Sequence, residues 1–595
     1  MRKELIALRD AMSRAGIDAY VIPTDDFHGS EYVGDYFKCR HYVSGFTGSA
    51  GILVVTKDWA GLWTDGRYFL QGAQQLEGSG IELCKMGEPD VPTVQEWLTL
   101  HMESGQVLGF DGRTMTAGTG MSLEMTMKKQ QISVVYDRDL VGEIWPARPS
   151  VPKAKAWELD IKYAGRSRSD KLKSLWQDVQ EAGADCHILT SLDDLAWLLN
   201  IRGGDVECCP VVLGFLLMDK SGVHLYTDEE KFSPALRRSL EKDGISFRPY
   251  LEVFADVNQI AAGSRVLVDP NKVSYAIVKN IPVNVQLLEA PNPTEHPKGV
   301  KTQAEQENER LAHLKDGLAL TRFMKWLKEH VGQELITEIS AAQKLEEFRA
   351  QQEHYLGPSF EPIFGFGPHG AIIHYSATEE SNVQLEPHGF LLSDTGGHYL
   401  EGSTDVTRTF VLGPLTEEMK HHYTMVLRGN LNLAAAKFKA GCSGASLDYI
   451  ARKPLWDEGL DYNHGTGHGV GYLLSVHEGP QNIRYRLSSG QGAGTPLEAG
   501  MITSDEPGIY LEENYGIRLE NLLLCVEKER NTYGTFLGFE TLTLCPFELE
   551  AIEPGCLTVE EKRLLNVYHE KVYQALSPYF TEEENVWLRE ATREI

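Results

Sequence analysis

Two aspartates in the last third of the chain could lie close enough to repel each other. Asp394 sits in LLSDTGG and Asp405 in GSTDVTRTF, and both stretches alternate apolar and polar residues around the segment GGHYLEG. This pattern predicts a β-hairpin. With the hairpin centred between Tyr399 and Leu400, the two aspartates would face each other with their Cβ atoms about 5 Å apart. Because like charges so placed disfavour folding, a cation between them is the simplest explanation.

Three further residues could complete a metal site. His468 lies in the glycine-rich HGTGHGVGY, Glu506 follows an apolar run in MITSDEPG, and Glu520 shares one face of a β-like stretch with Arg518. Four carboxylates and one imidazole suit Mn²⁺, Fe²⁺, Co²⁺ or Zn²⁺ better than a structural zinc site built from Cys and His, and they are enough for two metals. Each residue taken alone is more often an ordinary turn or loop residue. The residues by themselves therefore leave a metal site and these structural roles equally open.

Composition excludes several classes of partner. The chain of 595 residues carries 57 basic and 85 acidic side chains, a formal charge of −28 that disfavours nucleic acid and anionic membranes. Nine scattered cysteines, with no CxxC pair, indicate reduced thiols and not a disulfide framework. The N-terminus lacks the apolar core of a signal peptide, and no apolar run reaches membrane-spanning length. We therefore expect a cytoplasmic protein.

The chain is long enough for several domains, and its first half contains a weak repeat. Residues 16–26 resemble 183–194, and 60–73 resemble 222–235, which favours duplication of an α/β unit. Proline-rich breaks at 145–153 and 290–299 mark the expected boundaries. A long amphipathic helix is predicted over 303–331, further helices over 416–440 and 446–458, and two more after residue 557. The predicted divisions are 1–150, 151–298, 299–550 and 551–595.

Several short sequence motifs resemble those of a known family. The motifs IIHY, STDVTRT, HGTGHGVG, VHEGP, SDEPG and GIRLEN are similar to those of the pita-bread metallopeptidases, and most similar to Xaa-Pro aminopeptidases of the long, three-domain type. The resemblance covers essentially the whole chain. It implies an α/β fold with two creatinase-like N-terminal domains, a pita-bread catalytic domain and a C-terminal helical extension. It also implies a dinuclear centre, with Mn²⁺ preferred and Zn²⁺, Co²⁺ or Fe²⁺ as alternatives, held by the residues Asp394, Asp405, His468, Glu506 and Glu520.

The resemblance gives roles to neighbouring residues as well. His374 matches a histidine that lines the substrate pocket, His464 one near the proline side of the scissile bond, and His477 one that contacts the scissile carbonyl. Arg518 matches an arginine behind the metal carboxylates, and Tyr510 occupies the place of a substrate-side tyrosine. The local departures are Cys208–Cys209 and the glycine-rich run 488–496, both of which could alter entry to the site.

The implied activity is hydrolysis of the N-terminal Xaa-Pro bond of peptides by a metal-activated hydroxide, with Glu506 as general base. A prolidase restricted to dipeptides would use the same ligands. A metal-free, creatinase-like hydrolase is disfavoured because that branch does not keep this ligand set, and a non-catalytic binding protein should lack ligands that are present here. The long-form resemblance also implies a homodimer.

Overall fold

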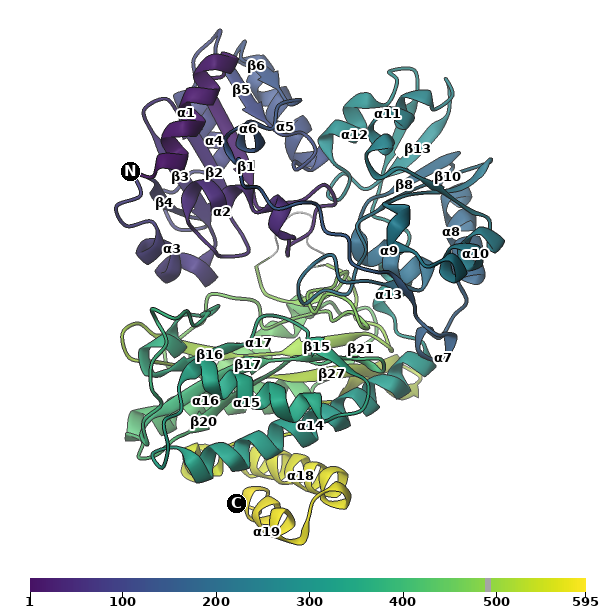
Figure 1. The fold of residues 1–595 in the computed structure, drawn as a ribbon. Coiled ribbons are helices and arrows are strands. Elements are labelled where there is room, and N and C mark those ends of the chain that lie inside the picture. Colours follow the sequence, from purple (N-terminus) through teal and green to yellow (C-terminus); the bar gives the residue numbers. More distant parts are fainter. Residues whose placement is uncertain (487–493) are drawn as a thin grey trace. The chain divides into compact units, whose positions relative to one another are not determined.

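A computed structural model describes residues 1–486 and 494–595 and divides the chain into two compact units, Met1–Glu295 and His296–Ile595 (Figure 1). The first unit is built around two six-stranded mixed sheets. The second unit contains antiparallel sheets with fewer strands, flanked by long helices. The division at Glu295 lies close to the break predicted from the proline-rich segment 290–299.

The two sheets of the first unit have the same topology. Each has a central antiparallel meander with parallel strands added at both edges, in the orders β4-β3-β2-β1-β5-β6 and β12-β11-β10-β8-β13-β14. The strands of the first sheet are β1 (Ala19–Pro23), β2 (Ile52–Thr56), β3 (Ala60–Thr64), β4 (Glu82–Lys85), β5 (Val107–Phe110) and β6 (Ser133–Val135). Those of the second are β8 (Cys186–Leu189), β10 (Phe215–Asp219), β11 (Gly222–Tyr226), β12 (Ile245–Arg248), β13 (Arg265–Val268) and β14 (Gln286–Glu289).

The internal repeat seen in the sequence corresponds to this shared topology. The similar segments at 16–26 and 183–194 contain β1 and β8, which are both the fourth strand in their sheets. The segments at 60–73 and 222–235 contain β3 and β11, which are both second. The repeat prediction is therefore confirmed at the level of strand order.

The second unit contains the predicted hairpin and the other strands that carry the candidate residues. Its strands pair antiparallel in small sheets, among them β16-β17-β20, β15-β18-β19 and β21-β28-β27-β24. Their bounds are β15 (Tyr355–Pro358), β16 (Ile363–Phe366), β17 (Phe390–Thr395), β18 (Gly397–Tyr399), β19 (Gly402–Ser403), β20 (Val406–Val411), β21 (Lys437–Lys439), β22 (Gly467–His468), β23 (Asn482–Ile483), β24 (Ile502–Asp505), β25 (Gly508–Leu511), β26 (Tyr515–Arg518), β27 (Asn521–Asn531) and β28 (Gly534–Thr541).

Long helices cover these sheets, and most were predicted. The helix expected over 303–331 is α14 (Gln303–His330), which begins at a capping box between Thr302 and Glu305 and places Phe323 and Leu327 in the core. The other helices are α15 (Glu338–Ala350), α16 (Glu417–Ala434), α17 (Asp448–Trp456), α18 (Val559–Leu576) and α19 (Glu582–Ala591). Figure 1 shows the C-terminal pair beside α14, and α18 packs against both α14 and α16. The apolar face of the tail therefore packs within the chain.

The hairpin exists, but its predicted register is wrong by two residues. Asp394 pairs with Thr407, and His398 with Ser403, so the turn is centred between Leu400 and Glu401. Asp405 is therefore a diagonal neighbour of Asp394 and does not lie directly opposite it. Because side chains alternate with a period of two, this shift leaves both aspartates on the same face. A cation shared by the two carboxylates therefore remains the simplest explanation of their placement.

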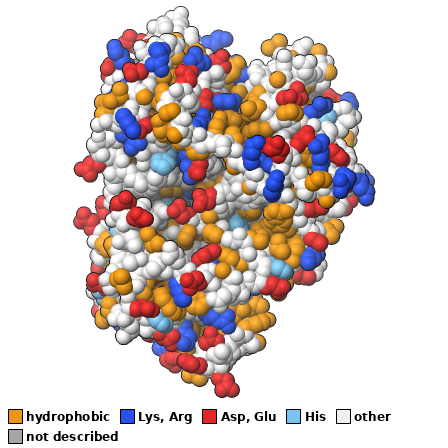
Figure 2. Space-filling view, viewed as in Figure 1, with side chains coloured by type: hydrophobic (Ala, Val, Ile, Leu, Met, Phe, Trp, Pro, Cys, Tyr) orange, Lys and Arg blue, Asp and Glu red, His pale blue; other side chains and the backbone are white. Residues whose placement is uncertain are grey.

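The surface is acidic overall but mixed in sign. Figure 2 shows red and blue side chains interspersed over the visible face, without one large field of either charge. Among the residues described by the structure, no helix is both long and apolar enough to cross a membrane.

Candidate metal centre

Five strand ends and loops bring the predicted ligands into one region of the second unit. Asp394 lies on β17, Asp405 immediately before β20, His468 at the end of β22, Glu506 immediately after β24, and Glu520 between β26 and β27. The structure therefore brings all five candidates together, on or directly beside neighbouring strands, as the sequence predicted.

Glycines allow these strands to approach closely. A Cβ at Gly396, in the middle of the hairpin, would lie 2.0 Å from the Thr404 carbonyl oxygen. A Cβ at Gly467, next to His468, would lie 1.9 Å from the Ser504 carbonyl oxygen. Side chains at either position would push apart the segments that carry the candidate ligands, which explains the glycines in both motifs.

The distances between the side chains match a site of metal size. His468 Nε2 lies 3.6 Å from Asp405 Oδ2 and 3.4 Å from Glu506 Oε1. One ligand atom from each of Asp405, His468 and Glu520 lies within 4.8 Å of the others. Metal-to-ligand bonds of about 2.0–2.2 Å put ligand atoms at roughly these separations.

Burial of the carboxylates is costly without a cation. Burial itself, followed by the negative charges of neighbouring carboxylates, raises the pKa values of Asp405 and Glu520 well above the ordinary range. Burial also raises the pKa of Glu506 to about 8, against the opposing effect of Arg518. Asp394 Oδ1 is buried and has no hydrogen-bond partner among the described residues. An unpartnered oxygen and three carboxylates that resist ionisation fit a divalent cation.

Arg518 supplies a positive charge behind this set. Its side chain is 2% exposed and donates to Asp394 Oδ2 at 2.6 Å, to Tyr510 Oη at 2.7 Å and to Thr407 Oγ1 at 3.1 Å. A fourth bond reaches the Ile373 carbonyl oxygen at 3.4 Å. The guanidinium therefore orients one candidate ligand and connects it to Tyr510, Thr407 and the Ile373 backbone.

Sequence reasoning missed the hydroxyl groups that hold these ligands in place. Thr407 Oγ1 donates to Glu520 Oε2 at 2.8 Å. Ser504 Oγ donates to Glu506 Oε1 at 3.1 Å and accepts from the His468 backbone N–H at 2.9 Å. The period of two in STDVTRT, which places Thr407 on the same face as Asp405, is the signal that could have found the threonine.

The three histidines named from the family resemblance occupy different surroundings. His464 Nε2 lies 2.8 Å from Tyr510 Oη, the same oxygen that Arg518 contacts. The His477 ring lies edge-on to the His468 ring with centroids 4.5 Å apart, and its charge lowers the pKa of Asp405. His374 is half-buried and directly follows Ile373, whose carbonyl accepts from Arg518.

A buried ion cluster anchors the loop that carries His477. The neighbouring Glu478 is 5% exposed and accepts from Lys298 Nζ at 2.9 Å and from Lys301 Nζ at 2.5 Å. Both lysines precede α14, so the cluster connects the His477 loop to the start of the unit. The two ammonium groups keep the pKa of Glu478 below its ordinary value despite burial.

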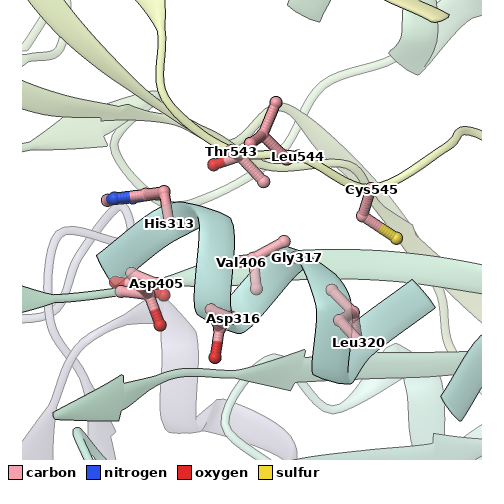
Figure 3. Close-up of a pocket in the computed structure, with 10 residues that line it drawn as sticks. His313, Asp316, Gly317, Leu320, Asp405, Val406, Thr543, Leu544 and Cys545 are labelled. Carbon is pink, nitrogen blue, oxygen red and sulfur yellow. The ribbon is translucent and has the colours of Figure 1, made fainter. Parts of the chain in front are cut away.

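A small cavity lies behind Asp405, with room for about one water molecule. Figure 3 shows His313, Asp316 and Leu320 projecting from α14 on one side, with Thr543 and Cys545 on the other.

Two features singled out in the sequence, which could alter entry to the site, stay predictions. Cys208 and Cys209 belong to the first unit, outside the strands that carry the candidate ligands. Of the glycine-rich run 488–496, residues 488–493 lie outside the described part of the chain.

Comparison with known proteins places this chain and its fold in a recognised class. Residues 307–527 match metallopeptidase family M24, residues 535–595 its C-terminal region, and residues 5–136 and 147–305 the creatinase/prolidase N-terminal domains. The chain is thus made of an M24 catalytic domain preceded by two creatinase-like α/β domains.

Relatives that match most or all of the chain show which family within this class it belongs to. The chain is 38% identical to aminopeptidase P2 of Arabidopsis thaliana, over 95% of this chain and 84% of that protein. It is 36% identical to a probable Xaa-Pro aminopeptidase P of Paracoccidioides brasiliensis, over 100% and 99% of the two chains. A solved X-prolyl aminopeptidase from Caenorhabditis elegans, described as cytosolic with a dinuclear active site, is 35% identical, with a TM-score of 0.95 over 100% of this chain and 99% of that one. The chain belongs to the Xaa-Pro aminopeptidase family.

Proposed function

We propose that this protein is a metal-dependent aminopeptidase that hydrolyses the N-terminal Xaa-Pro bond of peptides. The proposal rests on the convergence of Asp394, Asp405, His468, Glu506 and Glu520 on or directly beside neighbouring strands. Burial raises the pKa values of Asp405, Glu506 and Glu520, which a bound cation would offset. The full-length similarity to X-prolyl aminopeptidases supplies the reaction and the substrate class.

The proposed cofactor is a pair of divalent ions held by these five residues, with Mn²⁺ preferred and Zn²⁺, Co²⁺ or Fe²⁺ as alternatives. Oxygen-rich donors with one imidazole suit these metals, and the similar enzyme from Caenorhabditis elegans is described as dinuclear. Bound divalent ions in such a site acidify water and polarise the scissile carbonyl.

The protein side chains would move protons and stabilise developing charge. Glu506 is the proposed general base, because its carboxylate is fixed by Ser504 and its pKa is raised toward neutrality. It would take a proton from the attacking water and deliver it to the proline nitrogen as the C–N bond breaks. His477, whose ring lies against that of His468, is the proposed donor to the oxygen of the scissile carbonyl. His374 is the proposed second donor on the pocket wall.

The remaining groups would shape and orient the pocket. His464, Tyr510 and Arg518 form one connected chain of hydrogen bonds that ends on Asp394, so they are proposed to fix the proline side of the site relative to that ligand. A bond preceding proline has no amide N–H, so recognition can rest on shape and apolar walls without a backbone acceptor.

Substrate length separates this proposal from its main alternative, a prolidase. The test compares hydrolysis of the tripeptide Arg-Pro-Pro with that of the dipeptide Arg-Pro, each with added Mn²⁺ and with chelator. An aminopeptidase releases arginine from the tripeptide, and chelator abolishes the release. Cleavage of the dipeptide alone would establish the prolidase. Cleavage of neither peptide by metal-loaded protein would favour a non-catalytic binding role.

We also propose that the protein acts in the cytoplasm and forms a homodimer. The similar enzyme from Caenorhabditis elegans, which is described as cytosolic, supports the location. The C-terminal helices expose several apolar side chains that a second subunit could cover: Val559 (88% exposed), Val567 (56%), Tyr579 (55%) and Val586 (75%). A monomeric mass in sedimentation at micromolar concentration would refute the dimer.

A further inference from the structure

A second group of metal-binding side chains lies apart from the five residues of the centre. His421 is on α16, while Glu553 and Cys556 belong to the segment that leads into α18. The three side chains are partly exposed, and one ligand atom of each lies within 4.8 Å of the others. Imidazole, carboxylate and thiolate together are a donor set for Zn²⁺.

The spacing of these atoms matches the edges of a tetrahedral site. His421 Nδ1 lies 3.4 Å from Glu553 Oε2 and 3.8 Å from Cys556 Sγ. With Zn–N and Zn–O bonds of about 2.1 Å and a Zn–S bond of about 2.3 Å, neighbouring N and O ligands lie about 3.4 Å apart, and N and S about 3.6 Å. The side chains would therefore need only small movements to surround the ion.

Glu458 completes the arrangement on the far side of the imidazole. Its carboxylate oxygens lie 2.8 and 3.0 Å from His421 Nε2, so this nitrogen carries the proton and Nδ1 faces Glu553 and Cys556. A carboxylate that accepts from the outer nitrogen of a histidine is the usual way a metal-binding imidazole is oriented. In a protein without metal, the same contacts suit a protonated His421 between two glutamates, and they raise its pKa.

Charge also favours an ion here. A divalent cation would be neutralised by the Glu553 carboxylate and a Cys556 thiolate, with His421 neutral. Metal coordination deprotonates a cysteine thiol outright, so the thiolate would form as the ion binds.

We propose that His421, Glu553 and Cys556 form a Zn²⁺ site, with a fourth position open to water. The ion would join α16 to the segment on which the C-terminal helices begin. Ile552 and Leu557, on either side of this segment, pack into the core shared by α16 and α18. The site therefore fastens the C-terminal extension to the catalytic domain at its point of entry.

Cobalt substitution of the full-length protein tests this site separately from the catalytic centre. The five residues of that centre include no cysteine, so a thiolate-to-Co²⁺ charge-transfer band in the near ultraviolet can only report a cysteine site. Chelator-treated protein titrated with Co²⁺ should develop the band. Cys556→Ser should lose it, whereas Cys442→Ser, which changes another partly buried cysteine of the same unit, should keep it. No band in the unmodified protein, or a band that survives Cys556→Ser, would overturn the proposal.

Protection of Cys556 from alkylation by Zn²⁺ provides a second test that does not depend on an absorption band. Zn²⁺ should slow alkylation of Cys556 by about tenfold or more, because a coordinated thiolate is a poor nucleophile and is shielded from solvent. His421→Gln should abolish that protection while the protein remains folded, since His421 is partly exposed. Equal alkylation rates with and without Zn²⁺ in the unmodified protein would refute the site. Neither readout depends on peptidase activity.

Discussion

Replacing Arg518 by methionine removes the guanidinium from behind the carboxylates and nearly conserves the length of the side chain. In the metal-free protein, Asp394 then loses its 2.6 Å ion pair while remaining buried, and the hydroxyls of Tyr510 and Thr407 lose a donor. Breaking one side of a buried ion pair costs about 3–5 kcal/mol. Bound metal neutralises the same carboxylate, so the cost in the loaded protein should fall to the loss of hydrogen bonds, about 1–3 kcal/mol.

Urea unfolding, followed with and without metal, measures both values. We expect Arg518→Met to lose about 2 kcal/mol more in chelator than in Mn²⁺. Arg349→Met is the matched control, because Arg349 is equally buried and pairs with Asp316 at 2.7 Å, and Asp316 is not a proposed ligand. Its loss should be the same in both conditions. An Arg518→Met loss that metal leaves unchanged would refute the idea that the guanidinium and the metals share one set of carboxylates.

Three other changes test separate parts of the site. Glu506→Gln should lower kcat by about 10²–10⁴-fold with little change in the far-UV circular dichroism spectrum. The control Glu512→Gln, at an exposed position, should leave kcat unchanged. Near-normal turnover by Glu506→Gln would show that Glu506 is not the general base. In metal-free protein the pKa values of Asp405, Glu506 (about 8) and Glu520 are raised, so folding binds protons. The stability from these groups is greatest below the unfolded carboxyl pKa and is lost as pH rises toward 8, by up to about 1.4 kcal/mol per pH unit for each group. Thermal midpoints measured between about pH 5.5 and 8.5 should therefore fall with pH in chelator but not with metal, and parallel curves would contradict this. Tyr510→Phe removes the oxygen shared by His464 and Arg518 and should cost about 1–3 kcal/mol in urea unfolding; an unchanged midpoint would show that this oxygen is not needed.

Local signals in the sequence were sufficient for the long elements. The helix α14 could be predicted because its cap and its apolar spacing both lie within the segment itself. The duplicated α/β units could be predicted because corresponding strands keep their apolar character and order. In these cases the information is local, or is repeated along the chain.

The site was predictable in its residues but not in its detailed geometry. The hairpin register could not be fixed from alternation alone, since a shift of two residues preserves every side chain's face. The observed register depends on the turn at Leu400 and Glu401 and on the close approach at Gly396. The contacts of Ser504 and Arg518 depend on pairing between distant strands, which no local pattern encodes.

The residues of the proposed Zn²⁺ site could not be predicted from the sequence either. His421 and Cys556 are separated by 135 residues and meet only because α18 packs on α16. No spacing typical of zinc motifs marks them in the sequence.

Metal content and cleavage, measured on the same samples, test the central claim most directly. Chelator-treated Cys556→Ser protein, in which the second site cannot contribute, is titrated with Mn²⁺ while bound metal per chain and hydrolysis of Arg-Pro-Pro are recorded. If the five residues form the catalytic metal centre, cleavage should be absent without metal and should reach its full rate as bound metal approaches two ions per chain. Undiminished cleavage by metal-free protein, or two bound ions with no cleavage, would contradict it.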